Sequence, residues 1–198
     1  MLTTTIDGLW VLQVLTGIEV LAPELGLRPH LPSVESKALA LGHPMAAELR
    51  ERGVIDDNGV VDEPVAEWLT VLSKRDVGLV VDVAAQGEGP PRRVLLARFA
   101  QWWVVLERAD HLVRVSPGGT ACVEGAANAI ITDQIDRLCG TLQPAPLRPV
   151  TLDIGAMVGT VTNRDAMRRH LLSQGLDAGQ VQILMLAGDR QRSVRASI

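Results

Sequence analysis

The chain has 198 residues, 47% of them hydrophobic, and a formal net charge of −4 at neutral pH. This length and composition can bury the core of one domain, or of one domain with two lobes, and they exclude a disordered tail. The acidic balance argues against a non-specific nucleic-acid binder, although residues 148–198 carry seven Lys and Arg against four Asp and Glu.

Helical periodicity dominates the first 75 residues. We expect helices over residues 5–17, 33–41, 43–53 and 62–75. Thr5 can cap the first helix and Gly17 can end it, because a side-chain oxygen satisfies the first free N–H groups and glycine adopts the left-handed turn that follows a helix. In the last helix, apolar side chains recur at helical spacing and predict one buried face made of Val65, Trp68, Leu69 and Leu72.

Strand patterns follow in the middle of the chain. Residues 76–83 predict a strand, and residues 84–91 predict a loop because glycine and proline are frequent there. Residues 94–108 are too many for one ordinary strand, so we expect a hairpin with its turn at residues 100–101. A second turn at residues 109–110 would add a third strand to the hairpin.

Two adjacent tryptophans in this hairpin should point to opposite faces, because successive side chains of a strand alternate. In the expected register Trp102 lies opposite Phe99 on a wholly apolar face. Trp103 lies opposite Arg98 on a mixed face, where the guanidinium group can cover the indole ring. A mixed face suits a surface that meets another protein, but a helix of the same chain could also cover it.

The candidate partner-binding residues come from the mixed face and from the loop before the hairpin. On the mixed face they are Leu96, Arg98, Trp103 and Arg114. In the loop they are Gln86 and Glu88, since side chains on a loop outside the sheet can reach a partner.

After the hairpin, residues 116–119 predict a turn and the next residues a long helix that ends near Gly140. Cys122 and Cys139 would both lie in this segment as free, buried thiols, too far apart along one helix to form a disulfide.

A proline-rich connector at residues 143–149 is the best candidate for a lobe boundary. An N-terminal lobe with the first half of the sheet would occupy residues 1–142, and a second, incomplete lobe would begin at residues 150–198. The second lobe is expected to contain helices over residues 163–175 and 177–189, the latter capped by Asp177, and the start of a strand from residue 193.

Catalytic and metal-binding patterns give no support for an enzyme. The four histidines lack neighbours at metal-ligand spacing, and the sequence has no phosphate-binding loop, dinucleotide fingerprint or nucleophile elbow. We therefore expect no metal and no cofactor. The sequence also lacks a signal-peptide pattern and an apolar run long enough to cross a membrane.

A helix-turn-helix DNA-binding regulator is the non-enzymatic alternative that the residues themselves suggest. Residues 168–192 predict two helices joined by a glycine-containing turn, with arginines at both ends. The second helix offers only Gln180 and Gln182 as base-reading side chains among apolar residues, and a helix so apolar is more often part of a core.

The sequence resembles the EspG family of ESX secretion-associated proteins, and is most similar to the paralogue of the second ESX system. The resemblance is distributed over the whole chain and rests on several segments, none of them a catalytic motif. They are MLTTTIDGLWVLQ, PELGLRPHLPSVE, VAEWLTVLSKRD, LLARFAQWWVVLER, DRLCG and APLRPVTLD.

This resemblance implies a cytosolic chaperone of type VII secretion that binds a PE–PPE heterodimer, keeps it soluble and directs it to its own ESX system. It implies an α+β fold in which a central antiparallel sheet carries two helical lobes in pseudo-twofold relation, with no nucleic acid and no membrane insertion. Family members ordinarily continue beyond the position of Ile198, so we expect a C-terminally truncated chain. Such a chain could self-associate through an unpaired sheet edge, or it could be a non-functional remnant.

Overall fold

The computed structural model describes residues 1–84, 92–140, 146–151, 155, 163–188 and 195–197. The chain forms two compact units. The first comprises Met1–Ala84, Pro90–Gly140 and Ala196–Ile198, and the second comprises Ala85–Gly89 and Thr141–Arg195. The predicted connector at residues 143–149 falls partly outside the described residues, so the predicted lobe boundary stays a prediction.

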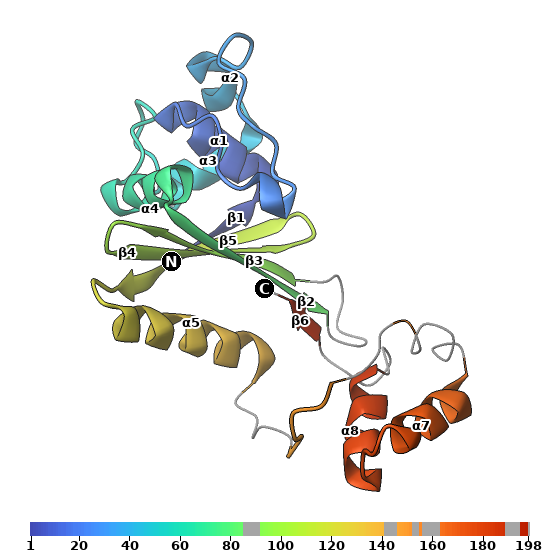
Figure 1. The fold of residues 1–198 in the computed structure, drawn as a ribbon. Helices are drawn as coiled ribbons and strands as arrows, with labels where there is room; N and C mark the ends of the chain where they lie inside the picture. Colours follow the sequence, from blue (N-terminus) through green and yellow to red (C-terminus); the bar gives the residue numbers. More distant parts are fainter. Residues whose placement is uncertain (85–91, 141–145, 152–154, 156–162, 189–194, 198) are drawn as a thin grey trace. The chain divides into compact units, whose positions relative to one another are not determined.

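A single sheet forms the centre of the first unit (Figure 1). Its strands are β1 (Leu2–Thr5), β2 (Val77–Ala84), β3 (Arg92–Phe99), β4 (Trp102–Ala109), β5 (Leu112–Thr120) and β6 (Arg195–Ser197). They lie in the order β1-β5-β4-β3-β2-β6. The pairs from β2 to β5, and β1 with β5, are antiparallel. The predicted α+β class with a central antiparallel sheet is confirmed.

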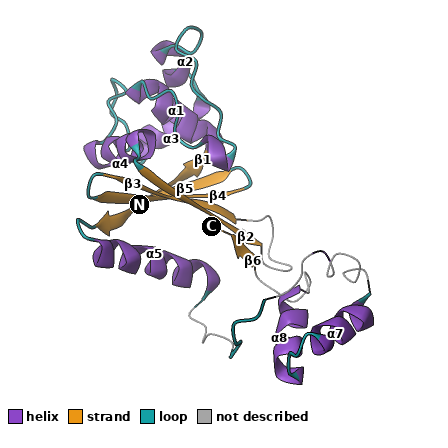
Figure 2. Cartoon of the chain, viewed as in Figure 1, coloured by secondary structure: helices purple, strands orange, loops and turns teal. Residues whose placement is uncertain are grey.

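Helices cover one face of this sheet, which we call the α1–α4 face (Figures 1 and 2). They are α1 (Ile6–Thr16), the short η1 (Pro23–Leu25), α2 (Lys37–Leu41), α3 (Pro44–Glu51) and α4 (Glu63–Lys74). The main core lies between them and the strands, and its fully buried side chains include Leu9, Leu12, Leu49, Leu69, Leu72, Leu95 and Leu106. Burial of these leucines contributes to the hydrophobic stabilisation of the first unit.

The caps predicted for α1 are confirmed. The Thr5 hydroxyl accepts a hydrogen bond of 3.1 Å from the backbone N–H of Gly8, and Gly17 ends the helix with φ of 70°. The second helix is shorter than predicted, because Ser36 caps it by accepting from the N–H of Leu39. The predicted residues 33–35 therefore lie outside the helix.

A single helix, α5 (Glu124–Cys139), packs on the opposite face, which we call the α5 face (Figure 2). The core there contains side chains of β2, β3 and β4 and the buried Leu138, with several smaller residues of α5 packed against it. Sequence reasoning placed Cys122 in this helix as a buried thiol, which was wrong. Cys122 precedes α5 and is exposed, and its thiol lies 3.2 Å from the side-chain oxygen of Gln101.

The turn predicted at residues 116–119 is also wrong, because β5 continues through these residues to Thr120. Gly118 is an extra residue opposite the step from Trp103 to Val104, which makes a β-bulge. A Cβ atom on Gly118 would lie 3.1 Å from the Cβ of Trp103 and 3.3 Å from its carbonyl oxygen. The glycine therefore serves the close approach of two strands and not a turn. Beyond Val115, β5 forms an outer rim that includes this bulge, since β1 pairs only with Leu112–Val115.

The second unit contains a pair of helices, α7 (Arg164–Ser173) and α8 (Ala178–Gly188), with a small core of Leu171, Leu176 and Val181. Asn163 caps α7 by accepting from two backbone N–H groups. Both helices that sequence reasoning expected in this region are present.

A buried carboxylate ties the segment before α2 to α1. Glu35 is only 8% exposed; it accepts hydrogen bonds of 2.7 Å from the Leu31 N–H and from Arg28, and it lies 2.9 Å from Nδ1 of His30. Burial raises the pKa of Glu35, but the hydrogen bonds outweigh it and lower the pKa from 4.5 to about 2. Arg28 also lies over the Trp10 ring of α1, 5.4 Å from its centroid.

This arrangement predicts an acid-sensitive contribution to stability. Because the folded state lowers the pKa of Glu35, the contribution is fully present above pH 4.5 and is lost as the pH falls toward 2. Glu35→Gln should lower the free energy of unfolding at pH 7 by about 2 kcal/mol, as for a buried hydrogen-bonded charge. Urea unfolding between pH 7 and pH 3 measures both effects, with the exposed Glu51→Gln as control. A variant as acid-sensitive as the parent chain would contradict the assignment.

Candidate functional site

Strands β3 and β4 pair in the register predicted from the sequence. Arg98 lies opposite Trp103, and Phe99 lies opposite Trp102. The next turn is displaced by one residue from its predicted position, since Ala109 pairs with Leu112. This displacement moves each cross-strand partner by two positions, so every side chain keeps its predicted face.

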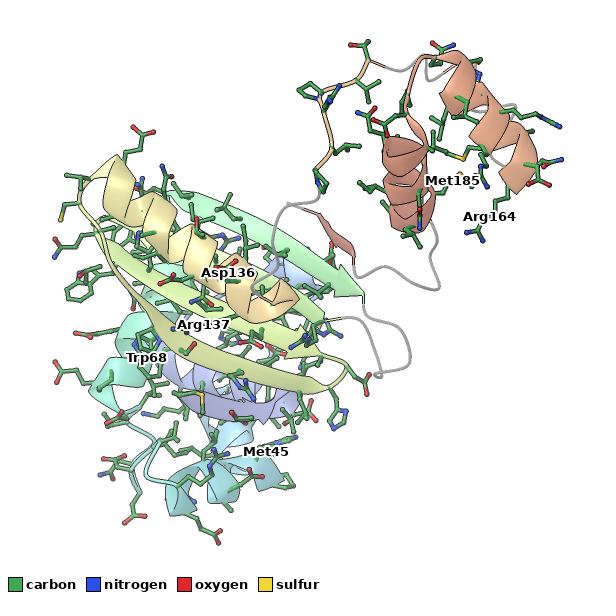
Figure 3. All side chains as sticks on the ribbon, turned by 90° about the horizontal axis from the view of Figure 1, so that it is seen from below. Met45, Trp68, Asp136, Arg137, Arg164 and Met185 are labelled. Atoms are coloured by element: carbon green, nitrogen blue, oxygen red, sulfur yellow. The ribbon has the colours of Figure 1, made fainter. Side chains whose placement is uncertain are left out.

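The burial of the tryptophan pair differs from the prediction for Trp102 and decides between the two alternatives for Trp103. Trp102, predicted to lie in the core, is 53% exposed, whereas Trp103, expected either on an open partner surface or under a helix of the same chain, is 2% exposed. Trp102 stands at the turn end of the hairpin, where the core of the α1–α4 face stops at Ala97 and Val104. Trp103 belongs to the core under α5. A helix of the same chain therefore covers the mixed face, as Figure 3 shows for α5 lying across the strands.

Arg98 lies at the edge of this buried face. Its guanidinium carbon lies 5.8 Å from the centroid of the Trp103 ring, as the sequence predicted. The same guanidinium donates hydrogen bonds of 3.2 and 3.1 Å to the carboxylate of Asp76, the residue before β2. The hydrogen bond from Arg98 is the main reason that the pKa of Asp76 lies below its ordinary value. Arg98 is thus engaged within the chain, although part of it remains exposed.

The other predicted residues of the mixed face divide into one buried and one exposed. Leu96 is buried in the core under α5, so it offers no surface to a partner. Arg114 is half-exposed and lies 4.0 Å from the carboxylate of Glu107. Gln86 and Glu88 lie outside the described residues. The structure therefore does not bring the four mixed-face residues together as one open surface.

An open apolar surface exists at the turn end of the hairpin, where sequence reasoning expected core. A groove of about 540 Å³ lies between α4 and the ends of β3, β4 and β5, and its lining includes Trp68, Phe99 and Trp102. Sequence reasoning assigned all three aromatic side chains to buried faces. The sequence does place Phe99 and Trp102 beside a turn. A turn lies at the end of a sheet, where the covering helices also end, so this position could have indicated that the two side chains are exposed.

The part of the chain that the structure describes contains no group of three His, Cys, Asp or Glu side chains that could hold a metal ion. No helix among the described residues is long and apolar enough to span a membrane.

The α7–α8 pair gives little support to a DNA-reading role. Gln180, one of its two candidate base-reading side chains, is buried and accepts a hydrogen bond of 3.3 Å from the N–H of Asp177. The Asp177 carboxylate in turn accepts from the N–H of Gln180 at 2.8 Å. This reciprocal cap uses Gln180 to start α8, which leaves Gln182 as the exposed candidate.

Comparison with known proteins assigns the chain to a family. A family model described as the EspG family matches residues 5–198. The chain belongs to the EspG family. The ESX-2 secretion-associated protein EspG2 of Mycobacterium tuberculosis H37Rv is 50% identical over 198 residues, which are 100% of this chain and 71% of that protein. The ESX-5 secretion-associated protein EspG5 of the same strain is 29% identical over 175 residues, which are 79% of this chain and 57% of EspG5.

A solved structure has the same fold. It is the Mycobacterium tuberculosis type VII secretion system chaperone EspG5 in complex with a PE25–PPE41 dimer. The similarity has a TM-score of 0.68 with 25% sequence identity, and it covers 94% of this chain and 71% of EspG5. The family resemblance noted in the sequence is confirmed.

The contrast between the two tryptophans gives a direct test of this EspG fold. Trp103→Ala should cost about 3–5 kcal/mol of stability because it leaves a large cavity under α5. Trp102→Ala should cost less than about 1 kcal/mol because half of its side chain is already in solvent. Urea unfolding of the two variants measures the difference.

A third variant separates ring packing from hydrogen bonding. The described residues offer no hydrogen-bond acceptor to the buried indole N–H of Trp103. Trp103→Phe, which keeps a ring and removes that N–H, should therefore be less destabilising than Trp103→Ala. Equal losses for Trp102→Ala and Trp103→Ala would refute the placement of α5.

Proposed function

We propose that this chain is a cytosolic chaperone of a type VII secretion system, which binds a PE–PPE heterodimer, keeps it soluble and directs it to its ESX system. The similarity to EspG5, solved in complex with PE25–PPE41, over 94% of the chain carries the proposal. The 50% identity to EspG2 supports a role in the ESX-2 system. The proposed role is binding and not catalysis, so we expect the residues responsible for it among exposed side chains and loops.

The strand register favours one end of the sheet for the PE–PPE contact. Glu107 of β4 pairs with Val94 of β3 on one side and with Arg114 of β5 on the other. Val94 is close to the start of β3. Arg114 therefore lies toward the end of the sheet at which β3 begins and β4 ends.

The remaining predicted residues are not proposed as direct contacts with the partner. Arg98 lies at the opposite end of β3 and is engaged with Asp76. Leu96 and Trp103 are buried under α5, so they affect binding only through the fold. We therefore propose Gln86, Glu88 and Arg114 as the residues that contact the PE–PPE heterodimer.

The test is co-expression of the chain with PE–PPE pairs encoded near its gene. Affinity capture followed by size-exclusion chromatography should give a complex that contains one copy of each protein. Failure to form a complex with every such pair would overturn the chaperone proposal. Salt-sensitive retention on duplex DNA would instead favour the regulator alternative.

Variants locate the contact within that complex. Arg114→Ala, and the double substitution Gln86→Ala with Glu88→Ala, should each weaken binding by at least about tenfold, the effect of a contact worth about 1.4 kcal/mol. Lys37→Ala is the matched control, because Lys37 is an exposed cation on the α1–α4 face. A complex that tolerates all of these substitutions would place the contact elsewhere.

A further inference from the structure

The groove between α4 and the turn end of the hairpin, which we call the aromatic groove, concentrates the aromatic side chains of the protein. The chain has only five aromatic residues, four Trp and one Phe. Three of them, Trp68, Phe99 and Trp102, line this groove, whereas the side chain of Trp103 is buried in the core under α5. Trp102 is 53% and Phe99 is 38% exposed, so both rings are partly in water at a place where helical cover has ended. Exposed tryptophan beside a groove is typical of a surface that gains binding energy when a partner covers it.

The charged side chains of the aromatic groove all have one sign. Its ionisable lining residues are Glu63 and Glu67 of α4, and neither Lys nor Arg contributes to it. Both carboxylates are exposed, and neither forms an ion pair or a side-chain hydrogen bond within the described part of the chain. Their spacing of four residues places them on the same side of the helix, where like charges repel each other. A cation bound between them would relieve this repulsion.

We propose that the aromatic groove binds a segment of a partner protein in which an arginine stands next to aliphatic side chains. The aliphatic side chain would fill the space between Trp68 and Phe99 and cover the exposed apolar surface. The guanidinium group would pair with the carboxylates of Glu63 and Glu67 and stack on the exposed ring of Trp102.

This site is separate from the PE–PPE contact proposed above. It lies at the turn end of β3 and β4, whereas Arg114 lies toward the other end of these strands. Both sites could therefore be occupied at the same time. The inference does not rest on the proposed function, because it follows from the lining of the groove alone.

A short peptide with alternating leucine and arginine, acetyl-LRLRL-amide, provides the probe. Titration into the full chain, followed by tryptophan fluorescence and calorimetry, should show saturable binding. The peptide acetyl-LELEL-amide, which has the opposite charge, should not bind, and acetyl-ARARA-amide, which lacks the large aliphatic side chains, should bind at least tenfold more weakly. Absence of binding by the LRLRL peptide would overturn the proposal.

Matched variants distinguish the groove from the acidic surface in general. The double substitution Glu63→Gln with Glu67→Gln should weaken binding at least tenfold. The control, Glu48→Gln with Glu51→Gln, removes the same number of charges from the exposed surface of α3 and should leave affinity unchanged. Equal loss in the two double variants would mean that the peptide senses only net charge, which contradicts a specific site.

The aromatic wall is tested separately. Trp102→Ala should also weaken binding at least tenfold, whereas Leu112→Ala, which truncates an exposed apolar side chain on β5, should not. The melting temperature of each variant verifies that it is folded. If the parent chain self-associates and the LRLRL peptide dissociates it, the occupant is a second copy of this chain, and the assignment to a different partner protein is wrong.

Discussion

The packing of Trp103 between the sheet and α5 is the contact on which the arrangement of the first unit depends. The indole ring is almost fully buried, together with Leu96 and Val105 of the same face. Its strand can approach β5 closely only because Gly118 has no side chain at the bulge. Arg98 lies over the ring at its margin and is held there by Asp76. This contact fixes α5 on one face of a sheet whose other face is already covered by α1, α3 and α4.

Covering both faces restricts where an EspG protein of this form can meet other molecules. A sheet packed on both sides has apolar side chains on both faces, and charged side chains are confined to strand ends and margins. Arg98, Glu107 and Arg114 are each partly exposed, in agreement with this rule. Binding surfaces are then expected at the two ends of the strands and on the connecting loops. The aromatic groove lies at one end of these strands, and Arg114 lies toward the other end.

Local sequence patterns predicted the helices and strands well. They did not predict which parts of the sheet the helices cover. Alternation gave the β3–β4 register, and capping chemistry gave the ends of α1 and the start of α8, because these depend on neighbours in the chain. The burial of Trp102 and Trp103 depends on how far α4 and α5 extend across the sheet, which involves distant residues. Glycines at residues 118–119 predicted a turn, yet the same lack of a side chain also permits close strand packing.

The outer rim of β5 has a consequence for how this protein can handle its clients. Beyond the four residues that pair with β1, the strand continues through Pro117 and the bulged Gly118. An open strand edge is a template on which another chain can add a strand, and it is a common starting point for aggregation. A proline, which has no N–H, and a bulge both interrupt that template. This rim is therefore poorly suited to strand addition, so a client that reaches it would be held by side chains and not by β-pairing with β5.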